Sequence, residues 1–233
     1  MRANRIFTDR LEAGQELAQA LAAYRGRPNV VVLGLPRGGV PVAFEVARYL
    51  GAPLDVLIVR KLGVPGHSEL AMGAIATGGI RLLNDEVVSA LQIPMEQIDD
   101  VAAIEQRELA RRETTYRGDR PAPDLRGSIA IVVDDGMATG STMRAAVQAL
   151  QQQGASQIVV AVPHAPADTV EVLRAMGVDV VCLEMPEPYF SVGSWYRTFP
   201  QIDDAEVRNL MEEAGGRKLK GGKPARGQSY PTG

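Results

Sequence analysis

An apolar strand in the second half of the chain leads through two carboxylates and a loop of small residues directly into a helix. This run covers residues 131–142 and reads Ile-Val-Val-Asp-Asp-Gly-Met-Ala-Thr-Gly-Ser-Thr. Its two glycines let backbone N–H groups turn inward, and the positive end of the following helix attracts a phosphate. Asp134 and Asp135 can accept hydrogen bonds from two sugar hydroxyls or approach Mg²⁺. The run therefore predicts a sugar-phosphate site between a strand and a helix.

The rest of the chain alternates apolar runs with segments of helical pattern. The apolar runs cover residues 29–33, 54–59, 129–133, 158–162 and 178–183, and the helical segments cover residues 8–24, 40–50, 141–150, 167–176 and 203–213. Continuous apolar strands that alternate with helices indicate a parallel sheet covered on both faces. We therefore expect an α/β fold in which a parallel sheet is flanked by helices. Ligands of such sheets bind beyond the carboxyl ends of the strands.

Two stretches depart from this alternation. Residues 73–81 have the pattern of an irregular strand or hairpin. Residues 84–118 have the pattern of two helical pieces broken at Pro94, and the second piece is highly charged. We assign them to a helical insertion of about residues 84–125, which could be a lid, a dimer arm or a solvated packing helix.

Composition limits the classes of function. Hydrophobic residues make up 45% of the 233 residues, and no apolar stretch approaches the roughly 20 residues of a membrane span. The only cysteine, Cys182, cannot form an internal disulfide, and residues 1–5 lead into a charged helix rather than a signal-peptide core. These features predict a cytoplasmic protein with no membrane partner.

Charge separates the body of the chain from its end. Residues 215–233 are rich in glycine, proline and cations, with five positive charges and no acid. The whole chain has a net charge of −3, so the body carries −8 without those five cations. We predict a single domain over residues 1–214 followed by a disordered basic tail. Nucleic acid is disfavoured as a partner, because the body is acidic and the helix at 95–118 mixes glutamates with its arginines.

Cations and glycines also follow the first two predicted strands. Pro36-Arg37-Gly38-Gly39 ends the first strand, where an arginine and the exposed amides of two glycines would bind a pyrophosphate. Arg60 and Lys61 close the second predicted strand and place two more cations near the same group. Each feature alone is also compatible with an ordinary turn or a solvated strand end.

The acidic loop resembles the 5-phosphoribosyl-1-pyrophosphate (PRPP) signature of type I phosphoribosyltransferases, and the arginine-glycine-glycine loop looks like their pyrophosphate loop. The resemblance covers roughly residues 28–200 and is nearest in motif to the purine-salvage members. It implies Mg²⁺ as the cofactor, with Asp134 and Asp135 as candidate ligands, a cis peptide bond before Arg37, and a homodimer. The residues implied for PRPP binding are Arg37, Gly38, Gly39, Arg60, Lys61, Asp134, Asp135, Ala138, Thr139, Gly140, Ser141 and Thr142.

The resemblance also implies a flexible catalytic loop and a small hood. The loop over residues 63–69 occupies the place of the catalytic loop and offers Glu69, and after it His67, as groups able to move a proton. Phe190 matches an aromatic residue that stacks on the base in purine enzymes. Together with Phe190, His164 and Trp195 are the expected acceptor-binding residues.

Two departures from the family pattern leave the acceptor open. Ala138 stands where hypoxanthine-guanine enzymes carry an aspartate base, and positions 163 and 164 lack the lysine that reads a 6-oxo group. We therefore expect hypoxanthine and guanine to be poor acceptors. The expected function is transfer of 5-phosphoribosyl from PRPP to a planar, nitrogenous acceptor with release of pyrophosphate. The alternative is a non-catalytic sensor of PRPP or nucleotides on the same fold, since both would use the same pocket.

Overall fold

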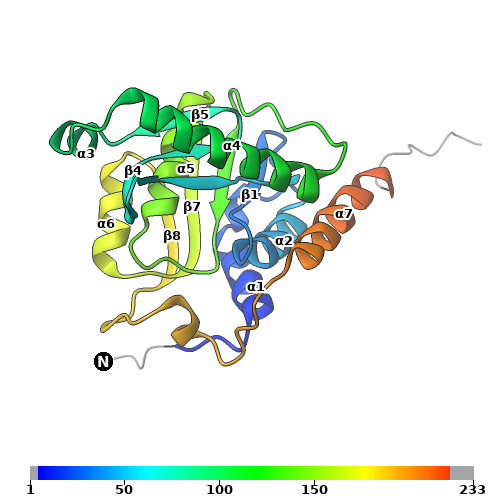
Figure 1. Ribbon diagram of the computed structural model, residues 1–233. Coiled ribbons are helices and arrows are strands. Elements are labelled where there is room, and N and C mark those ends of the chain that lie inside the picture. The colour runs from blue at the N-terminus through cyan, green and yellow to red at the C-terminus, as the bar shows by residue number, and fades with distance from the viewer. Residues whose placement is uncertain (1–4, 221–233) are drawn as a thin grey trace, which may run out of the picture.

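The computed structural model describes residues 5–220, and its centre is a five-stranded parallel sheet (Figure 1). The strand order is β2-β1-β6-β7-β8. The strands are β1 (Val30–Gly34), β2 (Leu54–Val56), β6 (Ile129–Val133), β7 (Gln157–His164) and β8 (Asp179–Glu184). Each neighbouring pair is parallel, which confirms the predicted α/β fold class.

Helices cover both faces of this sheet. Val30 and Val32 of β1 pack with α1 (Arg10–Ala20) and α2 (Gly39–Leu50) on one face. Val31 and Leu33 point to the other face, where they pack with α5 (Ser141–Gln152) and α6 (Ala167–Ala175). Because successive side chains of a strand point to opposite faces, both sets are buried and β1 is apolar almost throughout.

A three-stranded antiparallel sheet packs on α5, and it corrects the expected second strand. It consists of β3 (Val59–Val64), β4 (His67–Ala76) and β5 (Ile80–Leu83). The run predicted as one strand over residues 54–59 is divided, because β2 ends at Val56 and β3 begins at Val59 in the other sheet. Leu57 and Ile58 between them are buried, so the apolar pattern continues across the change of sheet.

The insertion after β5 consists of two helices, as the position of Pro94 predicts. In α3 (Asp85–Ala90) the side chain of Asn84 accepts a hydrogen bond from the first turn, and α4 (Met95–Arg117) begins directly after Pro94. The helix α4 lies across the top of the molecule in Figure 1 and packs against β3 and α7. Its last residue, Arg117, places Nη2 3.0 Å from a carboxylate oxygen of Asp55 in β2. In this structure α4 packs along its own domain.

The last helix is longer than expected. We predicted an end at Glu213 and a disordered tail from residue 215, but α7 (Asp204–Lys220) continues through the two glycines at 215 and 216. Arg120 donates a hydrogen bond from Nη1 to the Met211 carbonyl oxygen (2.8 Å), and α7 packs on α2 and α4. Tertiary packing thus outweighs the low helix propensity of the glycines. The rest of the predicted tail, residues 221–233, lies outside the described residues.

Residues 185–203 connect β8 to α7 and contain one 3-10 turn (Val192–Trp195). A second 3-10 turn (Ala22–Tyr24) follows α1. The 185–203 segment lies at the bottom of Figure 1, beside the first residues that the structure describes, where Phe7 pairs with Tyr196. The Phe7 N–H donates to the Trp195 carbonyl (2.9 Å), and the Arg197 N–H donates to the Phe7 carbonyl (2.8 Å). No helix within residues 5–220 is long and apolar enough to cross a membrane.

The buried pair between Arg117 and Asp55 should account for much of the attachment of α4. Their side chains are 9% and 10% exposed, so Asp55→Asn removes the nearer carboxylate and leaves Glu113, 3.6 Å from Nη1 of Arg117, as the remaining counter-ion. We expect Asp55→Asn to lower the free energy of unfolding by about 1–3 kcal/mol in urea denaturation, since charged hydrogen bonds to Arg117 are lost. The matched control is Asp124→Asn, whose partner Arg126 is 80% exposed, and it should change the free energy by less than about 1 kcal/mol. Equal effects of the two substitutions would contradict this assignment.

Candidate active site

The loops that follow β1 and β6 meet at the carboxyl edge of the parallel sheet. A Cβ atom placed on Gly38 would lie 2.0 Å from Oδ2 of Asp135, and one placed on Gly39 would lie 2.7 Å from the Val133 carbonyl oxygen. Only glycine fits at these two positions, because any side chain would overlap the acidic loop. The peptide bond between Pro36 and Arg37 is cis, as the family resemblance implies. The predicted pyrophosphate loop and the predicted sugar-phosphate loop are therefore in direct contact.

The end of the acidic loop presents the first turn of α5 to solvent. Gly140 adopts a φ of 67°, a left-handed conformation that favours glycine, and α5 begins at the next residue. Thr139, Ser141 and Thr142 are exposed, and the Thr169 hydroxyl holds the loop by donating to the Ala138 carbonyl oxygen (2.8 Å). The free N–H groups of a helix start attract an anion, so this turn can bind a phosphate.

The two acids of the loop have different surroundings. Oδ1 of Asp134 accepts a hydrogen bond from the Asp135 N–H (2.9 Å), whereas Oδ2 of Asp135 accepts from Nε of Arg10 (2.8 Å). Loss of hydration and the neighbouring carboxylate of Asp135 raise the pKa of Asp134 well above its usual value. Asp135 therefore has a dedicated counter-ion, and Asp134 is the acid that gains most from a bound cation or hydroxyl donor.

The carboxylates are compatible with Mg²⁺ only in combination with a substrate. Among residues 5–220, no group of three or more His, Cys, Asp or Glu side chains could hold a metal ion. Mg²⁺ is commonly bound by one or two carboxylates together with water and substrate phosphates rather than by a cage of protein ligands. Asp134 and Asp135, next to a phosphate-binding turn, fit that second arrangement.

The three predicted pyrophosphate cations are not equivalent. Arg37 is half-exposed beside the acidic loop, with Nη1 3.9 Å from Oδ1 of Asp204 in α7. Arg60 donates from Nε to Glu105 of α4 (2.7 Å), so its charge is already matched. Lys61 lies 3.8 Å from the Glu69 carboxylate. Arg60 and Lys61 belong to β3 rather than to the end of a parallel strand, and this corrects the position that we expected for them.

The predicted catalytic loop is a β-hairpin. Val64 of β3 pairs with His67 of β4, and Pro65 and Gly66 form the turn between them. Most of the expected loop over residues 63–69 is therefore strand. The Glu69 side chain is 99% exposed and His67 is exposed, so both candidate proton-transfer groups lie on a solvated hairpin. Their catalytic role stays a prediction.

His164 lies at the end of β7, inside a cluster of aromatic rings. It is fully buried, and its Nδ1 is 3.0 Å from the Tyr189 hydroxyl. Rings of the N-terminal residues and of the 185–203 segment surround it, namely Phe7, Tyr189, Trp195 and Tyr196. Burial lowers the pKa of His164 to about 4, which makes the imidazole neutral at physiological pH. Two atoms of the cluster, Nε2 of His164 and Nε1 of Trp195, are buried without a hydrogen-bond partner among residues 5–220.

The other acceptor candidates divide between this cluster and the surface. Trp195 is buried within the cluster, whereas Phe190 is 78% exposed. Gly136 joins the cluster to the acidic loop, because a Cβ atom there would lie 2.4 Å from Cε1 of His164. Sequence reasoning missed Phe7 and Arg10, which come from the N-terminal segment, outside every recognised motif. The only signal for Arg10 was a cation in the first turn of a helix, where the helix dipole disfavours it.

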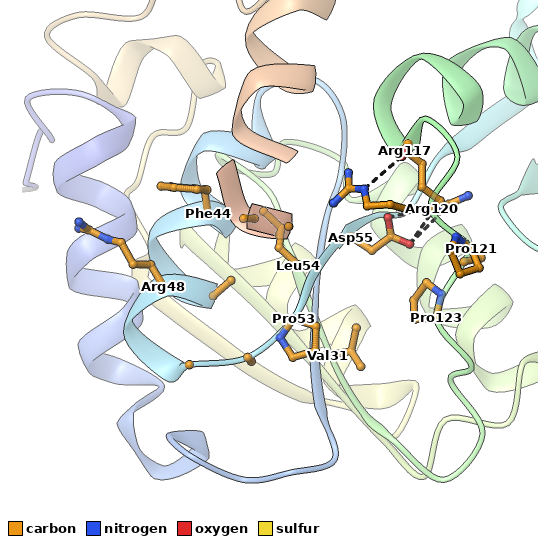
Figure 2. Close-up of a pocket in the computed structure, with 16 residues that line it drawn as sticks. Val31, Phe44, Arg48, Pro53, Leu54, Asp55, Arg117, Arg120, Pro121 and Pro123 are labelled. Atoms are coloured by element: carbon orange, nitrogen blue, oxygen red, sulfur yellow. Dashed lines mark hydrogen bonds and ion pairs between the residues drawn. The ribbon is translucent and has the colours of Figure 1, made fainter. Parts of the chain in front are cut away.

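A cavity lies away from this site, at the amino ends of β1 and β2 (Figure 2). Its volume is about 690 Å³, and it is bordered by α2, the start of β2, residues 117–123 and α7. Figure 2 shows Arg117 and Asp55 paired in its wall. The cavity shares none of the predicted phosphate-binding residues, so its size does not mark the candidate active site.

Comparison with known proteins agrees with this geometry. The model of the phosphoribosyl transferase domain family matches residues 6–195, and the chain belongs to that family. A Mycobacterium tuberculosis protein, provisionally named a phosphoribosyl transferase in two strains, is 50% identical over 210 residues. The match covers 90% of this chain and 47% of that protein, so the chain spans about half the length of the curated relatives it matches.

A solved structure supports the same conclusion for the fold. The crystal structure of TT1426 from Thermus thermophilus matches with a TM-score of 0.79 at 42% identity, over 89% of this chain and 98% of that chain. Together with the match to the phosphoribosyl transferase domain over residues 6–195, this confirms the fold predicted from the sequence.

The buried, neutral state of His164 predicts a pH dependence of stability. Its pKa is lowered from 6.5 to about 4 in the folded chain, so the unfolded chain binds the proton first as the pH falls. Stability should therefore decrease between about pH 6.5 and pH 4, by on the order of 3 kcal/mol from this group.

Denaturation of the wild type, His164→Gln and the control His67→Gln at several pH values tests this prediction. The difference in unfolding free energy between the wild type and His164→Gln should shrink as the pH falls, while His67→Gln, on an exposed residue, should follow the wild type. A constant difference for His164→Gln would show that the imidazole is not held neutral.

Proposed function

We propose that the chain is a phosphoribosyltransferase that transfers the 5-phosphoribosyl group of PRPP to a planar, nitrogenous acceptor and releases pyrophosphate. The observation that carries this proposal is the contact between the two loops, in which Gly38 abuts Asp135. This contact brings the loop of Arg37, the two acids and the start of α5 together at one edge of the sheet, which supports binding of a sugar that carries phosphates at both ends. Family membership implies PRPP binding and supports this assignment.

In this proposal each loop binds one part of PRPP. The exposed first turn of α5, with Thr139, Ser141 and Thr142, holds the 5-phosphate. Asp134 and Asp135 accept hydrogen bonds from the ribose hydroxyls. The backbone of Gly38 and Gly39 and the guanidinium of Arg37 hold the pyrophosphate. Bound Mg²⁺, with Asp134 and Asp135 as its protein ligands, would neutralise charge on the leaving pyrophosphate.

The acceptor would lie between the sugar and the 185–203 segment. Phe190 is exposed and able to stack on a planar molecule, and the unpartnered nitrogens of His164 and Trp195 are buried polar groups in the cluster that adjoins the acidic loop. Glu69, and after it His67, is the group proposed to move a proton. The hairpin that carries both residues would have to bend over the sugar to exclude water.

One observation favours the alternative function, a sensor that binds PRPP or a nucleotide without turning it over. Glu69 is 99% exposed on the hairpin of β3 and β4, and the ion pair that it makes is with Lys61 of the same hairpin rather than with a residue of the acidic loop. A protein that only binds PRPP needs the phosphate-binding loops but no general base. Pyrophosphate release from Mg–PRPP across a panel of nucleobases and other planar nitrogenous acceptors separates the two functions. Release with one acceptor supports the transferase, and binding without release supports the sensor.

We further propose a cytoplasmic homodimer, following the family resemblance. Size-exclusion chromatography with light scattering would measure the mass directly, and a monomer at micromolar concentration would reject the dimer.

Asp134→Asn should separate binding from stability, because the two effects have opposite signs. The raised pKa of Asp134 means that its ionised form is unfavourable in the ligand-free fold, so a neutral amide should raise the melting temperature. The same change should weaken Mg–PRPP binding by about 1–3 kcal/mol, since a charged hydrogen bond to the ligand is lost.

Calorimetric titration and thermal melting measure the two effects on the same sample. Glu171→Gln, on an exposed pair with Arg174 in α6, is the control and should change neither quantity. Unchanged Mg–PRPP affinity in Asp134→Asn would reject the site assignment.

A further inference from the structure

Arg10 is a buried cation in an unfavourable position. It is the first residue of α1 and is only 7% exposed. A cation at the start of a helix is repelled by the positive end of the helix dipole, and burial removes its hydration. Neither α1 nor the core benefits from a charge at this position, so its role must come from its partners.

Three contacts fix the guanidinium of Arg10. Its Nε donates to Oδ2 of Asp135 (2.8 Å), and its Nη1 donates to the Pro200 carbonyl oxygen (2.7 Å). Its Cζ lies 3.8 Å from the centroid of the Phe199 ring, a cation–π contact. One planar fork thus holds a residue of the acidic loop and two residues of the 185–203 segment. Lysine, with a single nitrogen, does not reproduce this geometry.

The first contact determines the shape of the proposed PRPP site. The Asp135 oxygen that Arg10 holds is the atom that lies against Gly38, 2.0 Å from where a Cβ would be. The Tyr196 hydroxyl donates to the Asp135 backbone carbonyl (2.6 Å), so this acid is held through both its side chain and its backbone. Arg10 therefore keeps Asp135 packed against the pyrophosphate loop.

The other two contacts determine where the acceptor-side segment lies. Phe199 stacks on Tyr196 with ring centroids 5.0 Å apart, and Tyr196 in turn contacts His164. The Thr198 N–H donates to the Thr8 carbonyl (3.0 Å), two residues before Arg10. A shift of Arg10 would thus be transmitted to the aromatic cluster as well as to Asp135.

We propose that Arg10 is a positioning residue that couples the PRPP loop to the acceptor-side 185–203 segment, so that donor and acceptor parts of the site are held by one guanidinium. The PRPP half of this inference rests on the proposed function. The acceptor-side half does not, because it concerns contacts of the ligand-free chain.

Two readouts test the two halves. Mg–PRPP affinity is measured by calorimetry, and the 185–203 segment is followed through Trp195, the only tryptophan of the chain, by its emission and its quenching by acrylamide. Arg10→Met should weaken Mg–PRPP binding about ten- to hundredfold and should increase quenching of Trp195 before any ligand is added. Arg48→Met, on a 47% exposed arginine of α2, is the matched control and should change neither readout.

Two further variants keep the test valid if Arg10→Met does not fold. Arg10→Lys retains the charge but holds fewer partners, so its affinity should lie between those of the wild type and Arg10→Met. Phe199→Leu removes only an acceptor-side contact, and it should increase Trp195 quenching while leaving Mg–PRPP affinity within about twofold of the wild type.

The outcomes distinguish this inference from the proposed function. If the wild type does not bind Mg–PRPP, the proposed function and the PRPP half of the inference are overturned, and Trp195 quenching alone decides the acceptor-side half. If the wild type binds and a folded Arg10→Met or Arg10→Lys binds equally well with unchanged quenching, Arg10 is only a structural residue of α1.

Discussion

The whole candidate site depends on how closely two loops of the parallel sheet approach each other. Gly38, after β1, lies so close to the carboxylate of Asp135, after β6, that a side chain at position 38 would overlap this carboxylate. This approach is possible because β1 and β6 pair directly over their whole length, from Val30 with Ile129 to Gly34 with Val133. Both strands end level with each other, so the loops that follow them must compete for the same space. Two consecutive glycines after β1, Gly38 and Gly39, leave the space that the acids after β6 occupy.

The buried pair of Arg10 and Asp135 stabilises this arrangement against the repulsion of two adjacent acids. Asp134 and Asp135 follow each other in the chain, and their mutual repulsion adds to burial in raising the pKa of Asp134. Arg10 gives Asp135 a counter-ion and leaves Asp134 with the less favourable surroundings. Without a ligand, the repulsion between these two carboxylates is only partly compensated. Such an arrangement is typical of sites that bind cations and polar ligands.

Much of this fold could be predicted from the sequence, because its signals are local. The apolar runs of β1 and β6 and the break at Pro94 each fix one element without reference to the rest of the chain. The division of residues 54–59 between two sheets could not be predicted, since Leu57 and Ile58 are buried in either arrangement. The length of α7 could not be predicted either, because packing on α2 and α4 decides it.

The candidate site, too, could be predicted from the sequence only in part. Sequence motifs identified the loops around Arg37 and Asp134, because the glycines and other small residues in these loops indicate exposed backbone N–H groups. Contacts between distant segments were not visible. Arg60 is matched by Glu105 of the insertion, Phe7 packs beside His164, and Arg10 reaches Asp135 across 125 positions of the chain. A pairing of this kind leaves no local pattern, so only the assembled fold shows it.

A crystal structure of the chain with Mg²⁺ and PRPP would test the central claim most directly. We predict that the pyrophosphate lies on the backbone of residues 37–39, the 5-phosphate on residues 139–142, and the ribose hydroxyls on Asp134 and Asp135, with the contact between Arg10 and Asp135 retained. PRPP bound elsewhere, for example in the cavity at the amino ends of β1 and β2, or bound with Arg10 turned away from Asp135, would contradict this account.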